Sequence, residues 1–286
     1  MELFFDMLRS IVYGVIEGIT EWLPISSTGH MILAEQVLKF SLSAEFMKMF
    51  RVVIQLGAIL AVVVLYFKKL WPFCSDNGRD SGLARHIRWP VMRLWGKILV
   101  ACLPAAVLGL LLDDWMDAHL YNSVVVAIML IVYGIAFILI ERRPRVPTTT
   151  KLSRITYKQA IIVGAWQVLA LIPGTSRSGA TIIGGLLCGM SRACASQFTF
   201  FLAIPVMAGA SGLKLVKFLA KGGVFTLGEV GTLLVGCIVA FVVSILAIRF
   251  LMDYVKKHTF TVFGWYRIAL GILVLGIWAL QSFVLA

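Results

Sequence analysis

The chain has 286 residues, of which 60% are hydrophobic and only 14% are charged, and its mean hydropathy is +0.94. A soluble domain is about 45–50% apolar and about 25% charged, so this composition excludes a cytosolic enzyme, a nucleic-acid-binding module and a secreted scaffold. It also excludes a transmembrane β-barrel, whose strands alternate between apolar and polar residues. The net charge of +12 fits the basic cytoplasmic loops of a membrane protein, so no nucleic-acid partner is expected.

The apolar stretches predict, in chain order, a broken hydrophobic region, three membrane spans, a second broken region and three more spans. A helix needs about 20 residues, with wide scatter, to cross a bilayer. The broken regions have two arms each, 7–23 with 30–40 and 159–172 with 180–190. The predicted spans are 50–67, 95–112, 120–140, 196–215, 229–251 and 262–284.

Both broken regions are predicted to be re-entrant hairpins, which enter and leave the membrane on the same side. Their arms are separated by polar loops, PISSTG at 24–29 and PGTSRSG at 173–179. The second arm of each has 11 residues, which at about 1.5 Å per residue reach about 16 Å, roughly half of the hydrocarbon core. Irregular backbone at that depth must be buried in protein or line a wet cavity.

The charges of the loops orient the chain. Loop 68–97 carries seven Lys and Arg residues and loop 141–158 carries six, whereas the turn 113–119 carries three Asp and neither Lys nor Arg. Cytoplasmic loops are enriched in Lys and Arg, so both basic loops are expected inside and the acidic turn outside. The first hairpin then enters from the outside, the second enters from the inside, and both termini lie outside. Three lysines of the segment 214–221 fall outside and oppose this orientation.

A shift of 150 residues aligns the two hairpins without a gap. It places Gly14 on Gly164, Glu17 on Gln167, Ser26 on Ser176, Thr28 on Ser178 and Gly29 on Gly179. Each half then contains one hairpin and three spans, and since three is odd the second half is upside down relative to the first.

The predicted fold is therefore an all-α polytopic membrane protein with an inverted-topology repeat, six transmembrane helices and two re-entrant helix-loop-helix hairpins. It forms a single integral membrane domain over 1–286. Repeat one occupies 1–145 with its hairpin at 7–40, and repeat two occupies 155–286 with its hairpin at 159–190.

Two acidic residues of the first hairpin are candidates for metal binding and catalysis. Glu17 and Glu21 are four residues apart and therefore lie on one helix face. Carboxylates at membrane depth are costly, and ionisable residues there are functional candidates. Their oxygens would bind a divalent cation, Mg²⁺ or Ca²⁺, together with phosphate oxygens of a substrate. The alternative is that they face a wet vestibule and cap neighbouring backbone.

Both polar loops lead into a helix start, where unpaired N–H groups and the helix dipole favour an anion. Two such starts facing each other, with the guanidinium of Arg177 between them, suit a diphosphate. Ser and Thr at these positions are also ordinary helix N-caps, and an ion pair with Glu17 or Glu21 is the alternative for Arg177. The predicted phosphate-binding residues are Ser26, Thr28, Gly29, Thr175, Ser176, Ser178 and Gly179.

Ser27 is the better candidate nucleophile, because its repeat mate is Arg177 whereas Ser26 keeps a serine, Ser176, as its mate. His30 lies three residues further on, and it could activate Ser27 as a general base, since its ordinary pKa is near the working pH. A His30 nucleophile, a metal-activated water, and a His30 that only packs in the core are the alternatives. The predicted catalytic residues are Glu17, Glu21, Ser27, His30 and Arg177.

Three stretches carry a resemblance to a known family: EGITEWLPISSTGH at 17–30, FRVVIQLG at 50–57 and PGTSRSGAT at 173–181. Together they resemble the bacterial undecaprenyl-diphosphate phosphatases of the bacitracin-resistance type, in order along the whole chain. The resemblance implies a multi-pass phosphatase of the bacterial inner membrane that converts the lipid diphosphate carrier to its monophosphate for cell-wall synthesis. It also implies a divalent cation, a site that opens to the periplasmic side, and functional roles for Glu17, Glu21, Ser27, His30 and Arg177.

Two other functions compete with this interpretation. A polyprenyl-phosphate transporter or flippase would share the inverted-repeat fold, but a pure carrier needs no Ser–His pair beside carboxylates. An intramembrane serine protease would use Ser27 and His30, but it gives no reason for Arg177 or for two opposed anion-binding helix starts. The sequence leaves open a homodimer, the preferred polyprenyl chain length and whether the product is also flipped.

Overall fold

A computed structural model describes residues 2–38, 40–75, 85–143 and 146–284. Helices joined by loops make up this part of the chain, and no β-strand longer than an isolated bridge occurs in it. The α-helices are α1 (Glu2–Thr20), α2 (Ser27–Val37), α3 (Ala44–Val53), α4 (Gln55–Leu65), α5 (Phe67–Leu70), α6 (Trp89–His119), α7 (Ser123–Glu141), α8 (Tyr157–Val168), α9 (Arg177–Leu187), α10 (Arg192–Ala220), α11 (Leu227–Lys257) and α12 (Thr261–Val284). Two short 3₁₀ helices, η2 (Leu152–Arg154) and η3 (Leu169–Leu171), flank α8.

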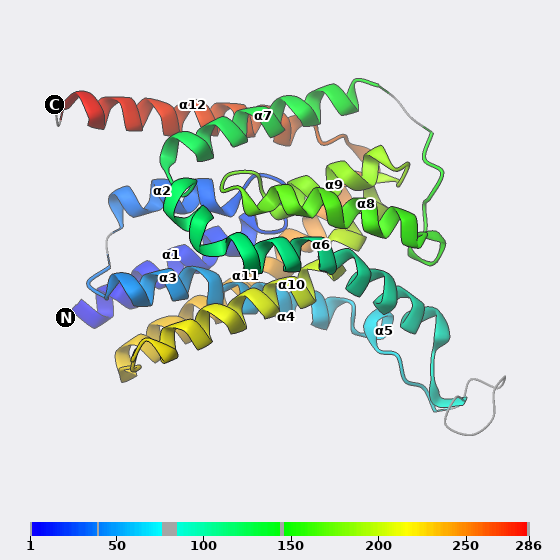
Figure 1. The fold of residues 1–286 in the computed structure, drawn as a ribbon, viewed down its shortest axis with the longest axis horizontal. Coiled ribbons are helices and arrows are strands. Elements are labelled where there is room, and N and C mark those ends of the chain that lie inside the picture. Colours follow the sequence, from blue (N-terminus) through cyan, green and yellow to red (C-terminus); the bar gives the residue numbers. More distant parts are fainter. Residues whose placement is uncertain (1, 39, 76–84, 144–145, 285–286) are drawn as a thin grey trace.

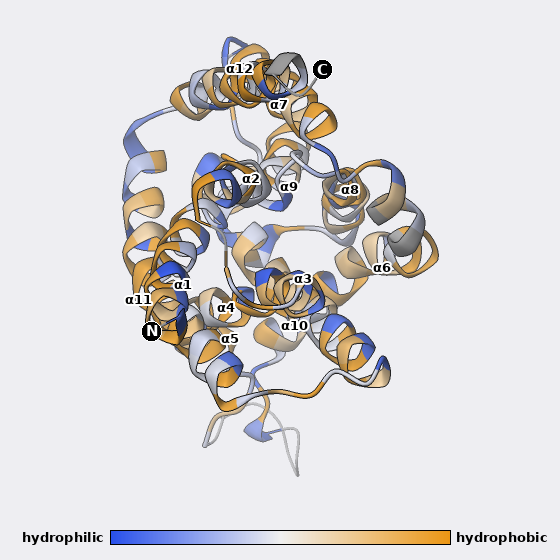
Figure 2. Ribbon diagram, turned by 90° about the vertical axis from the view of Figure 1, so that its left-hand side faces the viewer, coloured by the Kyte–Doolittle hydropathy of each residue, from blue (hydrophilic) through white to orange (hydrophobic). Residues whose placement is uncertain are grey.

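Six helical segments are long and apolar enough to cross a membrane, and each contains most of one predicted span. They are Ala44–Leu65 (α3 and α4 together), Trp89–Leu112, Ser123–Glu141, Arg192–Ala220, Leu227–Lys257 and Thr261–Ser282. They carry large exposed apolar side chains, such as Leu103, Leu110 and Leu246 at 58%, 69% and 62% exposure. Figure 2 shows that apolar residues predominate along these helices. Water does not tolerate so much exposed apolar surface, so the chain is a multi-pass membrane protein.

The helices extend beyond several predicted boundaries. The acidic segment 113–119, which we expected as a turn, is the end of α6, and α6 begins at Trp89 rather than at 95. Hydropathy detects only the part of a helix that lies in lipid, whereas the backbone hydrogen bonds of α6 continue to its C-cap Leu120. Asn122 then caps the start of α7. Part of the basic loop 68–97, residues 76–84, lies outside the described residues.

The two broken regions form helix pairs, α1 with α2 and α8 with α9. Their second arms, α2 and α9, have the expected length of 11 residues, but they begin three residues before the predicted starts at 30 and 180. The polar loop residues themselves build the first helical turn, because Ser26 and Ser176 act as the N-caps. Figure 2 shows α2 and α9 near the centre of a ring formed by the longer helices.

Glycines set the closest contacts between these pairs and the spans. A Cβ added at Gly14 of α1 would lie 2.7 Å from the carbonyl oxygen of Gly236 in α11. A Cβ added at Gly164 of α8 would lie 2.3 Å from the carbonyl oxygen of Ala101 in α6. These residues must therefore be glycine for the helices to approach as they do, and the first arm of each pair packs against one long span.

A third glycine contact, between α7 and α12, is reciprocal. A Cβ added at Gly134 would lie 2.7 Å from the carbonyl oxygen of Gly264, and one added at Gly264 would lie 2.8 Å from that of Gly134. The next-nearest atoms are also reciprocal. Ile268 Cγ1 would lie 2.8 Å from a Cβ at Gly134, and Ile138 Cγ1 would lie 2.9 Å from a Cβ at Gly264. A reciprocal contact of this kind is typical of a two-fold axis.

Candidate active site

Two buried acidic residues lie where α1 ends. Glu17 is in the last turn of α1 and Glu21 is in the turn that follows, and their exposures are 1% and 7%. Oε1 of Glu17 has no hydrogen-bond partner in the described part of the chain. Burying two carboxylates side by side is costly unless positive charge is brought to them.

Ser26 and Ser176 cap α2 and α9 in the same way. Ser26 Oγ accepts a hydrogen bond from the N–H of Gly29 at 3.5 Å, and Ser176 Oγ accepts one from the N–H of Gly179 at 3.2 Å. Their φ angles are 73° and 69°, and no other non-glycine residue of the described ranges has a positive φ. Such backbone strain persists only where the surrounding structure holds it, and it clusters at functional sites.

Arg177 provides the required positive charge and joins the two loops. Its Nε and Nη2 donate to Oε1 of Glu21 at 3.1 and 3.0 Å, and the two side chains are 11% and 8% exposed. Its Nη1 donates to the backbone carbonyl of Thr199 at 3.0 Å, and the guanidinium lies 5.8 Å from the ring of Trp22. The partner of Arg177 is therefore Glu21, and the loops that the sequence predicts to form one site are in contact.

A second link between the loops runs through serine hydroxyls. Ser178 Oγ donates to the carbonyl oxygen of Leu23 at 3.3 Å, and Ser176 Oγ lies 3.1 Å from Ser178 Oγ. Trp22, in the first loop, packs edge-on against Phe200 of α10 with ring centroids 5.3 Å apart. Both rings are buried, so hydrophobic packing holds the first loop in place beneath the polar contacts.

Ser27 contacts one of the buried carboxylates. Its Oγ donates to Oε2 of Glu21 at 3.3 Å, while Oε1 of the same carboxylate holds Arg177. Ser27 is half-buried, and its place in the first turn of α2 leaves its hydroxyl close to the helix start. The group in position to take a proton from Ser27 is Glu21.

His30 makes two hydrogen bonds that define its tautomer. Its Nδ1 lies 2.7 Å from the carbonyl oxygen of Ser26, which can only accept, so Nδ1 carries a proton. In the neutral ring Nε2 then accepts from the hydroxyl of Tyr266 at 2.7 Å. The ring of Tyr266 also stacks on that of His30, at 5.6 Å and 8°. Both ring nitrogens of His30 are therefore engaged with groups other than Ser27.

Arg267 is a further site residue that sequence reasoning missed. It is fully buried in α12, and its guanidinium donates to the carbonyl oxygens of Pro24 at 3.2 Å, Gly174 at 2.9 Å and Thr175 at 2.8 Å. One side chain thus holds both polar loops. A lone arginine inside the apolar stretch 262–284 was a usable signal, since charges within membrane spans are functional candidates.

The other predicted phosphate-binding residues surround these contacts. Gly29 and Gly179 supply the capped N–H groups described above, and a Cβ added at Gly179 would lie 3.1 Å from Nη1 of Arg267. Thr175 is fully buried, and its hydroxyl has no hydrogen-bond partner among the described residues. Thr28 is half-buried in the first turn of α2.

Buried oxygen atoms without a partner at the repeat-related positions 17 and 167 are compatible with a cation, which takes oxygen ligands. Oε1 of Glu17 and both amide atoms of Gln167 are buried and have no hydrogen-bond partner in the described part of the chain. No group of three or more His, Cys, Asp or Glu side chains occurs there. Glu17 and Glu21 would therefore provide only part of a coordination shell, as is usual for Mg²⁺ that also binds substrate phosphate.

Comparison with known proteins identifies relatives along the whole chain. The family described as "Bacitracin resistance protein BacA" matches residues 10–273. An undecaprenyl-diphosphatase of Enterococcus faecalis is 60% identical over 278 residues, covering 96% of this chain and 99% of the relative. Undecaprenyl-diphosphatases of Streptococcus gordonii and Lactococcus lactis are 56% and 55% identical to this chain. Both alignments cover 98% of this chain, and they cover 98% of the Streptococcus gordonii protein and 99% of the Lactococcus lactis protein.

Proposed function

This chain belongs to the bacitracin resistance protein BacA family, and on that premise we propose that it hydrolyses undecaprenyl diphosphate to undecaprenyl phosphate and inorganic phosphate. It is a membrane-bound hydrolase that recycles the lipid carrier for cell-wall synthesis, and it confers bacitracin resistance. The structural observation that carries the proposal is the ion pair of Arg177 with Glu21, which joins the two hairpin loops and so brings the starts of α2 and α9 to one site.

The diphosphate binds between the starts of α2 and α9. Their N–H groups and dipoles favour an anion, and Arg177 adds a guanidinium with five N–H donors. Three of these donors are used by Glu21 and Thr199 among the described residues, so two remain for phosphate oxygens. The apolar tail of the substrate stays in lipid, because the outer faces of the spans are apolar.

Ser27 attacks the terminal phosphorus. The new bond joins Ser27 Oγ to phosphorus, the bond to the bridging oxygen breaks, and undecaprenyl phosphate leaves. The proton of Ser27 passes to Glu21, as supported by their 3.3 Å contact. Water then hydrolyses the phosphoserine and releases phosphate, and His30 with the half-exposed Tyr266 carries protons between the site and its surroundings.

Glu17 and Glu21 would hold a divalent cation, Mg²⁺ or Ca²⁺. The unpaired Oε1 of Glu17 supports this assignment, because a buried carboxylate oxygen without a partner is otherwise costly. When bound, the cation would neutralise charge on the phosphate oxygens, which is the main requirement of phosphoryl transfer. Arg177 shares that task from the second hairpin.

In the membrane, the two helix pairs are re-entrant hairpins and the chain is an inverted repeat of 1–145 and 155–286. The packing supports this, because the first arm of each hairpin packs on the second span of the other half. These contacts are α1 with α11 and α8 with α6. The reciprocal contact of Gly134 with Gly264 supports a two-fold axis between α7 and α12. The start of α1 and the end of α12 lie at the same end of the molecule in Figure 1, as this topology requires.

The enzyme resides in the bacterial inner membrane, with its site open to the periplasmic side. The basic loops 68–97 and 141–158 support this orientation, because cytoplasmic loops are enriched in Lys and Arg. In this orientation α1 and α2 dip in from the periplasm, and α8 and α9 dip in from the cytoplasm. Their loops then meet at mid-depth, where inverted-repeat membrane proteins place their sites.

Phosphate release from undecaprenyl diphosphate by purified protein in detergent tests the proposal. Ser27→Ala, Arg177→Ala and Glu21→Gln should each lower the rate by about 10³-fold or more, because the residues act as a unit, whereas Ser153→Ala on an exposed 3₁₀ helix should not. Loss in Glu21→Gln but not in Ser27→Ala would make water the nucleophile. Activity near wild type in all three variants would contradict the proposed site. Release without a membrane gradient distinguishes the enzyme from a pure transporter.

A further inference from the structure

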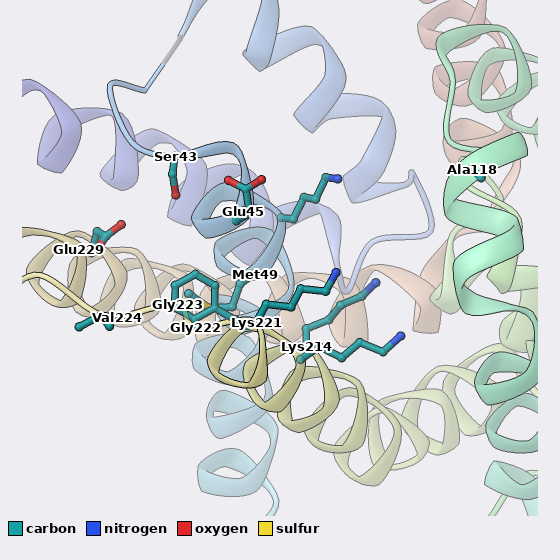
Figure 3. Close-up of a pocket in the computed structure, with 13 residues that line it drawn as sticks. Ser43, Glu45, Met49, Ala118, Lys214, Lys221, Gly222, Gly223, Val224 and Glu229 are labelled. Carbon is teal, nitrogen blue, oxygen red and sulfur yellow. The ribbon is translucent and has the colours of Figure 1, made fainter.

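Cavities lie at the two ends of α10, a helix of 29 residues. The larger, of about 650 Å³, is formed where α10 ends, and Figure 3 shows Lys214, Glu45 and Glu229 around it. The smaller, of about 340 Å³, is formed where α10 begins. At about 1.5 Å per residue the helix spans roughly 43 Å, so substitutions at one cavity leave the other unchanged.

The smaller cavity lies where α7, α9 and α11 end. Ile140, Leu186 and Val255 line it from the last turns of these three helices, and Met190 lines it from the loop that leads to α10. Two of the helices, α7 and α11, are long and apolar enough to be membrane spans. Their apolar parts end here, so the cavity lies at the depth where a lipid headgroup joins its acyl chains. No residue of the polar loops 21–30 or 171–181 is among its described lining residues.

Three basic side chains line this cavity, which we call the basic pocket: Arg143, Arg192 and Lys256. Glu141 is the one acidic residue of its described lining. Nε and Nη2 of Arg192 donate to the two oxygens of that carboxylate at 2.8 and 2.6 Å, and the N–H of Phe260 donates to it at 3.1 Å. Glu141 therefore balances Arg192, and it leaves the charges of Arg143 and Lys256 uncompensated within the lining.

Arg143 and Lys256 are available to an anion. Arg143 is exposed and forms no ion pair with a described residue. Residues 144 and 145 of the sequence are proline and arginine, so they add no acidic group beside it. Nζ of Lys256 donates to Asp253 at 2.8 Å, but the two side chains are 59% and 77% exposed, and such exposed pairs contribute little free energy.

Hydrogen bonds hold the walls of the basic pocket in place. The N–H groups of Thr148 and Thr149 donate to the carbonyl oxygen of Gly189 at 2.9 and 3.0 Å, and the N–H of Ser191 donates to that of Thr149 at 2.9 Å. These bonds join the segment that contains the lining residue Pro147 to the loop between α9 and α10. The ion pair of α7 with α10 fixes another wall. A preformed site loses less conformational entropy when it binds a ligand.

We propose that the basic pocket binds the phosphate of an anionic membrane phospholipid. Basic pockets between transmembrane helices on the cytoplasmic side bind such headgroups, and the proposed orientation places this pocket on that side. Arginine can bind phosphate oxygens in pairs and lysine binds them as a point charge. The apolar side chains of Ile140, Leu186 and Val255 beside them suit a phosphate that carries acyl chains. Binding itself is independent of the proposed catalytic function.

Native mass spectrometry of the purified protein with added phosphatidylglycerol tests the site. R143Q/K256Q should raise the apparent Kd for this lipid about tenfold, the effect of losing about 1.4 kcal/mol. R143K/K256R should bind it close to the wild-type affinity, because both charges are kept. Phosphatidylcholine, which has no net charge, should bind to the wild type and to R143Q/K256Q alike.

A matched control removes the same two charges from neighbouring positions. R142Q/K257Q changes exposed residues that are not among the described lining residues, and it should bind phosphatidylglycerol as the wild type does. Equal affinities of R143Q/K256Q and the wild type would overturn the proposal. An equal loss in R142Q/K257Q would overturn it too, since the basic surface alone would then explain the binding.

Two further measurements keep the test decisive. Arg143→Gln and Lys256→Gln, made singly, should each weaken binding about threefold at an unchanged melting temperature without lipid, and no loss in either would contradict the site. Inorganic phosphate at the concentration of the lipid should not displace phosphatidylglycerol, because it lacks acyl chains. Full displacement would make free phosphate the ligand and would overturn the assignment to a lipid.

Discussion

Replacement of Arg267 by methionine should weaken both the stability and the activity of this protein, because one buried guanidinium holds both hairpin loops. Its three shortest hydrogen bonds end on the carbonyl oxygens of Pro24, Gly174 and Thr175, at 2.8–3.2 Å. Methionine keeps the apolar length of the side chain and fills irregular space well, but it has no N–H donor. The variant therefore removes the link between the loops and leaves the packing of α12 largely intact.

The expected magnitude follows from these contacts. A hydrogen bond from a charged group is worth about 1.5–3 kcal/mol net, so the three bonds together contribute about 4–9 kcal/mol. Arg267 has no carboxylate partner within the described ranges, and removing a buried charge returns several kcal/mol of desolvation free energy. We expect a net loss of roughly 2–4 kcal/mol in the free energy of unfolding. Because about 1.4 kcal/mol is tenfold in rate, loosened loops should lower kcat/KM by about tenfold or more.

The assay compares the melting temperature in detergent and the rate of phosphate release for Arg267→Met and for a control, Arg249→Met. Arg249 is an exposed arginine of α11, so its replacement should leave both quantities unchanged. If Arg267→Met melted at the control temperature and released phosphate at the control rate, the guanidinium would not hold the loops, and our account of the site would be wrong.

Three further predictions concern single groups. Tyr266→Phe removes the hydroxyl that donates to His30 and should lower kcat/KM about tenfold at an unchanged melting temperature; an unchanged kcat/KM would refute this role. Gly164→Ala places a Cβ 2.3 Å from a carbonyl oxygen of α6 and should cost about 1–3 kcal/mol, seen as a lower melting temperature. Gly209→Ala, with open space around its Cβ, is its control, and equal melting would contradict the close packing. Glu17→Gln should raise the Mg²⁺ concentration needed for half-maximal activity about tenfold, and an unshifted titration would remove Glu17 from the cation site.

Much of the architecture and of the site follows from local sequence properties. The six spans could be predicted because hydropathy over about 20 residues depends on composition alone. That a helix follows each polar loop could be predicted because Ser26 and Ser176 combine hydroxyl N-caps with a glycine three residues later, although each helix begins three residues before its predicted arm. The polar loops could be assigned to one site because a motif repeated with unlike charges, Glu21 in one copy and Arg177 in the other, indicates complementary halves.

The pairing of individual groups was decided only by the tertiary structure. Arg177 binds Glu21 rather than Glu17, and the hydroxyl of Ser27 meets Glu21 while His30 faces Tyr266. These contacts join residues up to 236 positions apart, and they depend on how closely and at what rotation the helices pack. Residue spacing along one helix defines its faces, but the neighbour of each face is selected only when all the helices pack together, with glycines setting their closest approach.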